Sequence, residues 1–91
     1  MSAVREQSGS RYAVVVQSDL LALFTWLVAP TSTSARQASL HPEIEVQGDV
    51  TRVLAERTAA VDPARLGASV GYLTLDELRQ VHAALRLVLA L

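Results

Sequence analysis

The sequence predicts a mainly β protein that ends in one α-helix, folded as a small barrel that the helix closes or caps. Two observations lead to this prediction. Short apolar runs separated by turn residues fill the first two-thirds of the chain, which is typical of a barrel of short strands. Residues 75–90 instead carry leucine and valine at helical spacing. A chain of 91 residues has the length of one domain, which we expect to span residues 1–91.

The early strands are expected where apolar or β-branched residues run without a turn signal. The first predicted strand is 12–17, and the second is 25–29. The second strand is expected to end at Pro30, because proline has no N–H to donate to a sheet. Residues 43–56 alternate between polar and apolar and are interrupted by Gln-Gly-Asp, which predicts a hairpin.

Two further strands are expected before the helix. Residues 58–61 can continue as a strand, and 62–65 form a turn or a single helical turn, because proline follows an N-cap aspartate. The last predicted strand is 68–73, with Gly67 and Gly71 marking a bend or a bulge.

The helix has a start signal and two distinct faces. Thr74 and Glu77 form a predicted capping box, in which each side chain bonds to the other residue's backbone N–H. The predicted apolar stripe consists of Leu75, Leu78, Val81, Leu85 and Val88, and the opposite face carries Arg79, His82 and Arg86.

Composition excludes several classes of protein. The chain has no cysteine, so disulfide frameworks and thiolate chemistry are excluded. The two histidines, His41 and His82, are far apart and lack metal-ligand spacing, so we expect no metal and no cofactor. We interpret His41 as a loop residue before Pro42, and His82 as part of the polar helix face.

Location and partners are also constrained by composition. The start of the chain has no apolar signal region, and no uninterrupted apolar run is long enough to span a bilayer, so we expect a cytoplasmic protein without a membrane partner. The net charge of −1 does not by itself indicate a nucleic-acid binder.

Polar groups lie at three predicted strand boundaries. Arg11 opens the first strand, Thr31 and Ser32 follow the second, and Glu56 and Arg57 end the hairpin. Loops at strand ends gather at one rim of a small barrel, so these groups could converge. Each also has a simpler explanation: a surface cation, turn chemistry after proline, or an exposed carboxylate.

Taken together, these strings resemble the MazF/PemK toxins, which are small bacterial endoribonucleases of toxin–antitoxin pairs. Residues 6–11 (EQSGSR) are similar to the family's Glu-Gln-x-Gly-x-Arg loop, and the apolar strand after it ends in a Thr-Ser pair at 31–32. Residues 54–57 (LAER) resemble its Leu-x-Glu/Asp-Gln string. Residues 62–73 (DPARLGASVGYL) resemble its Asp-x-x-Arg-Leu-Gly-x-x-Val-Gly-x-Leu string.

The resemblance implies an SH3-like β-barrel of the MazF/CcdB/Kid type with a C-terminal helix. It also implies a homodimer, a cognate MazE-like antitoxin, and metal-independent, sequence-specific cleavage of single-stranded RNA. The family's catalytic loop arginine and strand-end threonine correspond to Arg11 and Thr31, and we expect both side chains to face solvent. Further RNA contacts are expected from Gln7, Ser32, Arg36, Glu56 and Arg57.

Three departures from the family pattern stand out. The family's usual first strand, Arg-Gly-acidic-apolar-Trp, is not found before the loop, so we expect that strand to be missing and residues 12–17 to form an open edge. Tyr12 replaces the usual proline, and Arg57 replaces the usual glutamine.

The chemistry expected of an RNA-cleaving site can be assigned in part. Attack by a 2′-hydroxyl on the adjacent phosphate needs a donor for the charge that develops, and the guanidinium fork of Arg11 suits this role. Thr31 can donate its hydroxyl or orient the phosphate, Glu56 can organise the site, and the proton acceptor is left open.

Two non-catalytic alternatives remain. One is an inactive relic that still binds the antitoxin, favoured by the missing strand. The other is a gyrase poison of the CcdB type. Those proteins act through a tryptophan near the C-terminus, whereas the only tryptophan here is Trp26.

Overall fold

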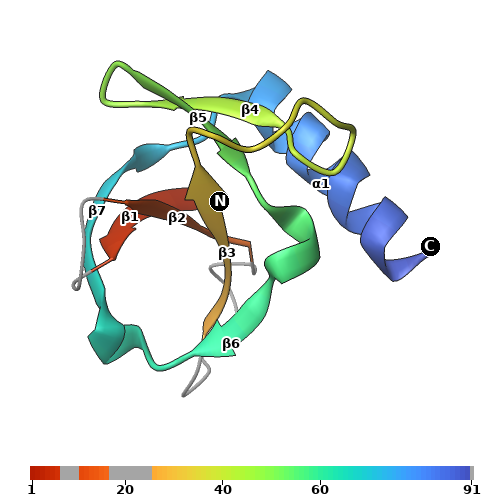
Figure 1. Ribbon diagram of the computed structural model, residues 1–91. Coiled ribbons are helices and arrows are strands. Elements are labelled where there is room, and N and C mark those ends of the chain that lie inside the picture. The colour runs from red at the N-terminus through yellow and green to blue at the C-terminus, as the bar shows by residue number, and fades with distance from the viewer. Residues whose placement is uncertain (7–10, 17–25, 91) are drawn as a thin grey trace.

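In the computed structural model, residues 1–6, 11–16 and 26–90 are described. Within these ranges, seven strands form one curved sheet in the order β4-β5-β3-β2-β1-β7, and β6 pairs with β3 (Figure 1). The strands are β1 (Ser2–Glu6), β2 (Tyr12–Val15), β3 (Trp26–Ser32), β4 (Glu43–Val46), β5 (Asp49–Val53), β6 (Ala59–Val61) and β7 (Leu66–Tyr72). Two short 3₁₀ turns, η1 (Ala55–Arg57) and η2 (Pro63–Arg65), precede β6 and β7, and α1 (Leu75–Leu89) ends the chain.

The predicted fold class is confirmed. The sheet curls into a small barrel seen end-on in Figure 1, and α1 lies along the side formed by β4 and β5. The hairpin is also confirmed: Val46 pairs with Asp49, and the turn residues Gln47 and Gly48 both have positive φ, as a two-residue type I′ turn requires.

The expectation of a missing first strand is wrong. β1 pairs antiparallel with β2, with Val4 opposite Ala13, and with β7 on its other side. Ladder hydrogen bonds use backbone groups, so Ser2–Glu6 forms this strand although its side chains do not match the family string. The ladder covers the edge of β2 that was expected to be open.

The expectation that Pro30 ends a strand is also wrong, because β3 continues through it to Ser32. The start of β3 pairs with β6, and its end pairs with β5. Pro30 lies between these two pairings, at a point where its missing N–H breaks no ladder, and its carbonyl accepts from Leu54 N–H at 2.8 Å.

The expected bend in the last strand is confirmed. The β1–β7 register shifts between Ala3 and Val4 and again between Val4 and Glu6. Gly71, opposite Ala3, has φ +154, and a Cβ at Gly67 would lie 3.0 Å from the Arg5 carbonyl oxygen. Both glycines therefore allow β7 to bend closely around β1.

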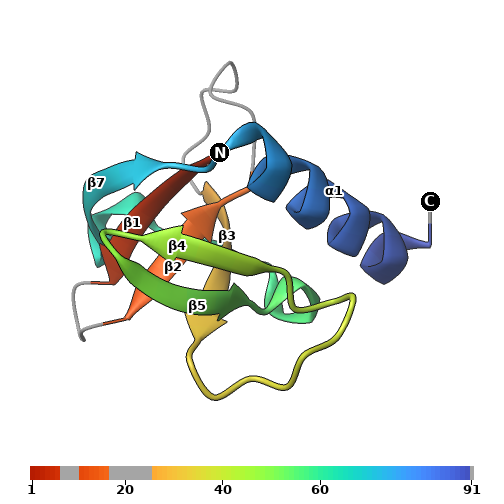
Figure 2. The ribbon, with the colours of Figure 1, turned by 90° about the horizontal axis from the view of Figure 1, so that it is seen from above.

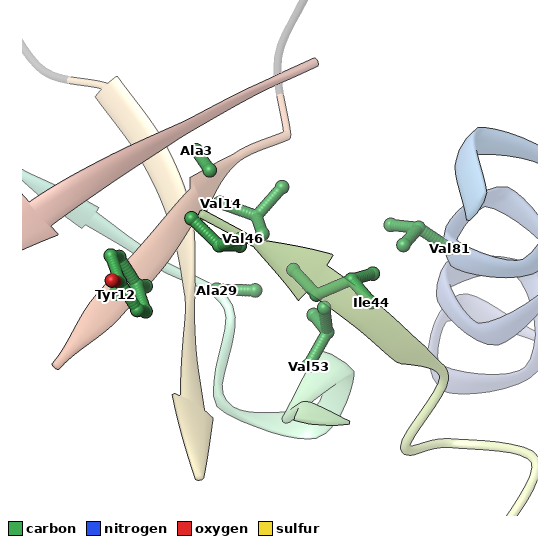
Figure 3. Packing of buried hydrophobic residues seen from close by; sticks show 8 residues of the cluster. All are labelled: Ala3, Tyr12, Val14, Ala29, Ile44, Val46, Val53 and Val81. Carbon is green, nitrogen blue, oxygen red and sulfur yellow. The ribbon is translucent and has the colours of Figure 1, made fainter. Parts of the chain in front are cut away.

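The core is aliphatic and joins the sheet to the helix. Figure 3 shows Ile44, Val53 and Val81 from β4, β5 and α1 among the fully buried residues. The capping box of Thr74 and Glu77 is present as predicted.

The predicted apolar stripe of the helix is only partly buried. Val81 and Ala84 are buried, whereas Leu75 and Val88 at the ends of the stripe are exposed. The C-terminal end of α1 extends beyond the sheet (Figure 2), so its last turns have no core to contact. Among the helices in the described ranges, none is long and apolar enough to cross a membrane.

Candidate active site

Arg11 is fixed at the mouth of β2 by its backbone. The Glu6 N–H donates to the Arg11 carbonyl oxygen at 3.0 Å, which closes the connection between β1 and β2, and the next pair of the ladder is Arg5 with Tyr12. The Arg11 side chain is exposed. The sheet therefore holds the arginine's backbone in place while its guanidinium faces solvent.

Thr31 is only 2% exposed, so the expectation that its side chain faces solvent is wrong. It pairs with Val53 of β5, and its hydroxyl donates to the Tyr12 carbonyl oxygen at 2.7 Å. Strand alternation explains this burial, because Ala29 and Thr31 lie on the same inner face of β3. The Thr31 hydroxyl thus ties the end of β3 to the start of β2, next to Arg11.

Two adjoining hollows lie at this rim, and Arg11 and Ser32 line both. The first also includes Thr31 and, from the β4–β5 hairpin, Asp49. The second, of about 280 Å³, is completed by Ala35, His41, Leu54, Glu56 and Arg57. Residues from all three strand boundaries, namely Arg11, Ser32, Glu56 and Arg57, therefore line one hollow.

Sequence reasoning missed His41, which pairs with the predicted site residue Glu56 in the second hollow. His41 Nε2 is 2.8 Å from one oxygen of the Glu56 carboxylate and 3.0 Å from the other. His41 Nδ1 is 2.8 Å from the Arg36 carbonyl oxygen. The signal is weak in the sequence, since the residues are fifteen positions apart and a histidine before a proline is typical of a loop.

The remaining predicted site residues can now be located relative to this pair. The side chains of Arg36 and Arg57 are exposed, and Ser32 Oγ lies 3.1 Å from Ser34 Oγ. Gln7 lies outside the described residues. The predicted RNA-contacting residues that can be placed therefore lie on or beside one rim, although Arg36 does not line either hollow.

The electrostatics of the rim favour an anion. In the described ranges the two ion pairs join His41 to Glu56 and Arg52 to Glu43, so neither uses Arg11 or Arg57. The Arg11 fork can therefore pair with two oxygens of a phosphate. Over the same residues, no group of three or more His, Asp or Glu side chains is placed to hold a metal ion.

Tyr12, at the position of the family's usual proline, connects the rim to the hairpin. Its ring is 7% exposed, and its hydroxyl donates to Asp49 at 3.2 Å. The Arg5 guanidinium stacks over the ring at 5.0 Å from its centre, which adds a cation–π contact. The substitution is thus accommodated by new polar contacts along the wall of the first hollow.

Comparison with known proteins identifies relatives of the chain along nearly its whole length. Residues 2–89 match the model of the family described as PemK-like, MazF-like toxin of type II toxin–antitoxin system. A curated protein of Mycobacterium tuberculosis (strain ATCC 25618 / H37Rv), named "Putative toxin Rv3098A/RVBD_3098A", is 40% identical over 83 residues, which cover 89% of this chain and 78% of that protein.

Solved structures share the fold. The Mycobacterium tuberculosis toxin MazF-mt6 superposes with a TM-score of 0.86 over 100% of this chain and 98% of its own, at 16% identity. An endoribonuclease in complex with its cognate antitoxin, from a mycobacterial species, superposes with a TM-score of 0.84 over 99% of this chain and 93% of its own, also at 16% identity.

Proposed function

This chain belongs to the PemK-like, MazF-like toxins of type II toxin–antitoxin systems, and on that premise we propose that it is an endoribonuclease. The proposed reaction is metal-independent, sequence-specific cleavage of single-stranded RNA in the cytoplasm. The main support is the Arg11 guanidinium, which is exposed at the rim of two hollows while its backbone is held by the sheet. That solved structures with this fold bear the name endoribonuclease agrees with the proposal.

In the proposed reaction, a 2′-hydroxyl attacks the neighbouring phosphorus, and negative charge builds up on the phosphate oxygens. Arg11 binds two of these oxygens through its fork, and it does so without reorganising, because β2 holds its backbone. Its permanent charge excludes Arg11 as the group that accepts the 2′-hydroxyl proton.

The hydroxyl of Thr31 was expected to contact or orient the phosphate, and we now assign the two neighbouring hydroxyls of Thr31 and Ser32 different roles. The Thr31 hydrogen is donated to the Tyr12 carbonyl, so we assign Thr31 the role of positioning the strand mouth that carries Arg11. Ser32 is less buried and lines both hollows beside Arg11, so its hydroxyl is placed to contact the RNA backbone. Arg57 adds a second cation on the same rim.

The family implies a cognate antitoxin as partner. We propose that an acidic, MazE-like segment crosses the rim at the exposed side chains of Arg11, Arg36 and Arg57, where it would also block access of RNA.

We also propose a homodimer. The edge of β2 is not available for a second copy, because β1 covers it. Support for the dimer comes from apolar side chains on the last turns of the helix, where Leu87 and Leu89 are 60% and 63% exposed. The alternative of an inactive relic is no longer supported, since it depended on the first strand being missing.

An RNA cleavage assay tests the proposal directly. The protein should cut single-stranded RNA in EDTA and leave a duplex of the same sequence intact. Arg11→Ala should reduce the rate by roughly 10²–10³, the usual effect of removing one preorganised donor. Arg11→Lys should also be poor, because an ammonium cannot reproduce the fork.

The matched control is Arg79→Ala, which removes an exposed arginine from α1 and should cleave normally. Full activity of a folded Arg11→Ala protein would remove Arg11 from the mechanism. Absence of cleavage by the unmodified protein on a library of single-stranded sequences would overturn the function.

A further inference from the structure

The hydrogen bonds of His41 fix where its protons lie. A backbone carbonyl can only accept, so Nδ1, at 2.8 Å from the Arg36 carbonyl oxygen, carries a hydrogen. Nε2 faces the two oxygens of Glu56 at 2.8 and 3.0 Å. If neither partner held a proton there, a nitrogen lone pair would face a carboxylate. The pair therefore shares a proton between Nε2 and the carboxyl group.

This proton is held beside the proposed phosphate site. His41 and Glu56 line the hollow that Arg11, Ser32 and Arg57 also line. The His41 side chain is 20% exposed and that of Glu56 is 36% exposed, so the carboxyl group is the more accessible member of the pair. A substrate phosphate bound by Arg11 would place its bridging oxygens within the same small space.

Cationic side chains lie close to this shared proton. Arg11 and Arg57 line the same hollow as the pair, and the Arg52 guanidinium donates to the His41 carbonyl oxygen at 2.8 Å. Two arginines therefore line the hollow together with the pair, and a proton that leaves the pair makes this hollow less positive. An alkoxide that forms nearby is a ready acceptor for that proton.

We propose that the His41–Glu56 pair is the general acid of RNA cleavage, an inference that rests on the proposed ribonuclease function. The 2′-oxygen forms a bond to phosphorus and releases its proton to solvent water. The bond from phosphorus to the 5′-oxygen breaks, and the shared proton passes through the Glu56 carboxyl group to that oxygen. The products are a 2′,3′-cyclic phosphate and a 5′-hydroxyl, and water returns a proton to the pair.

In this reaction Glu56 is the catalytic residue, because its carboxyl group contacts the leaving oxygen. His41 supplies the proton and holds the carboxyl group in place. The Arg36 carbonyl fixes the ring, so the loop between β3 and β4 and the turn η1 together build the acid. Neither residue is close to the other in sequence, which is why only the folded chain indicates this role.

Two substitutions interrupt the proposed path of the proton through the pair while preserving the hydrogen bond. In His41→Gln an amide nitrogen can take the place of Nε2 and donate to Glu56, and in Glu56→Gln an amide oxygen can still accept from His41. Neither amide can act as an acid at neutral pH. On ordinary RNA both should lose roughly 10²–10⁴ in rate, the usual contribution of general acid–base catalysis.

A second substrate separates the loss of an acid from damage to the site. In this RNA, sulfur replaces the bridging 5′-oxygen at the cleaved linkage, and the departing thiolate needs no proton because a thiol is a much stronger acid than an alcohol. The two variants should cleave this substrate nearly as fast as the unmodified protein. Arg11→Ala should be slow on both substrates, since it acts on the phosphate and not on the leaving group.

Matched controls are His82→Gln and Glu45→Gln, which change an exposed histidine and an exposed glutamate away from the rim and should behave normally. Normal cleavage of ordinary RNA by His41→Gln or Glu56→Gln would overturn the acid role. So would equal losses on the oxygen and sulfur substrates, which would indicate a structural role. If the unmodified protein cleaves neither substrate, the ribonuclease function fails along with the inference.

Discussion

The hydroxyl of Thr31 offers a sharp test of how the rim is built. Thr31→Val keeps the shape of the side chain and removes the hydrogen bond of 2.7 Å to the Tyr12 carbonyl, at a site that is only 2% exposed. The lost bond and the carbonyl left without this donor cost about 2–3 kcal/mol. The additional buried methyl group returns about 0.8 kcal/mol. The net loss of unfolding free energy should therefore be about 1–2 kcal/mol.

Thermal unfolding followed by circular dichroism measures this change. For a chain of 91 residues, the expected fall in Tm is about 4–16 °C. Thr31→Ser, which keeps the hydroxyl, should keep more of the stability because the carbonyl retains its donor. Cleavage by Thr31→Val should fall less than cleavage by Arg11→Ala, because the variant loosens the strand mouth but leaves the guanidinium in place.

Two results would refute this reasoning. An unchanged Tm for Thr31→Val would mean that the hydroxyl–carbonyl bond contributes no more than the about 0.8 kcal/mol that the added methyl group returns. An unchanged Tm together with a loss of cleavage as large as that of Arg11→Ala would show that the Thr31 hydroxyl acts on the RNA itself. The positioning role would then be wrong.

The two proposed assemblies can be tested separately. Light scattering at micromolar concentration should give the mass of a dimer. The double variant Leu87→Asp and Leu89→Asp should give the mass of a monomer. A monomer mass for the unmodified protein would exclude the dimer. Charge reversal at Arg36 and Arg57 should weaken antitoxin binding at low salt by roughly tenfold or more, since close charge pairs across an interface couple by about 1.5 kcal/mol or more. Unchanged affinity in calorimetry would place the antitoxin elsewhere.

The elements that the sequence predicted well depend on interactions within a few residues. The capping box of Thr74 and Glu77, the hairpin turn at Gln47 and Gly48, and the short turn after Asp62 all satisfy backbone groups locally. Such signals can be found in the sequence because their partners lie next to them in the chain. The position of Arg11, Thr31, Ser32, Glu56 and Arg57 at predicted strand ends likewise indicated that these groups could converge.

The predictions for β1 and for the end of β3 were wrong because strands far away in the sequence stabilise these two segments. β1 is a short segment that becomes a strand because β2 and β7 pair with it on both sides. β3 passes through Pro30 because its neighbour changes there from β6 to β5, which removes the need for an N–H. The pairings of β1 and β3 cannot be recognised from the local pattern of side chains.

The sequence by itself determined the fold class, the terminal helix and the arginine at the strand mouth, because periodicity, caps and strand-end position are properties of neighbouring residues. Only the tertiary structure decided which hydroxyl is buried and which partner His41 finds. Thr31 is buried by the register of β3 against β5, and His41 meets Glu56 because the loop before β4 folds against η1. Both outcomes depend on contacts between segments far apart in the chain, whose geometry is set by the curved sheet as a whole.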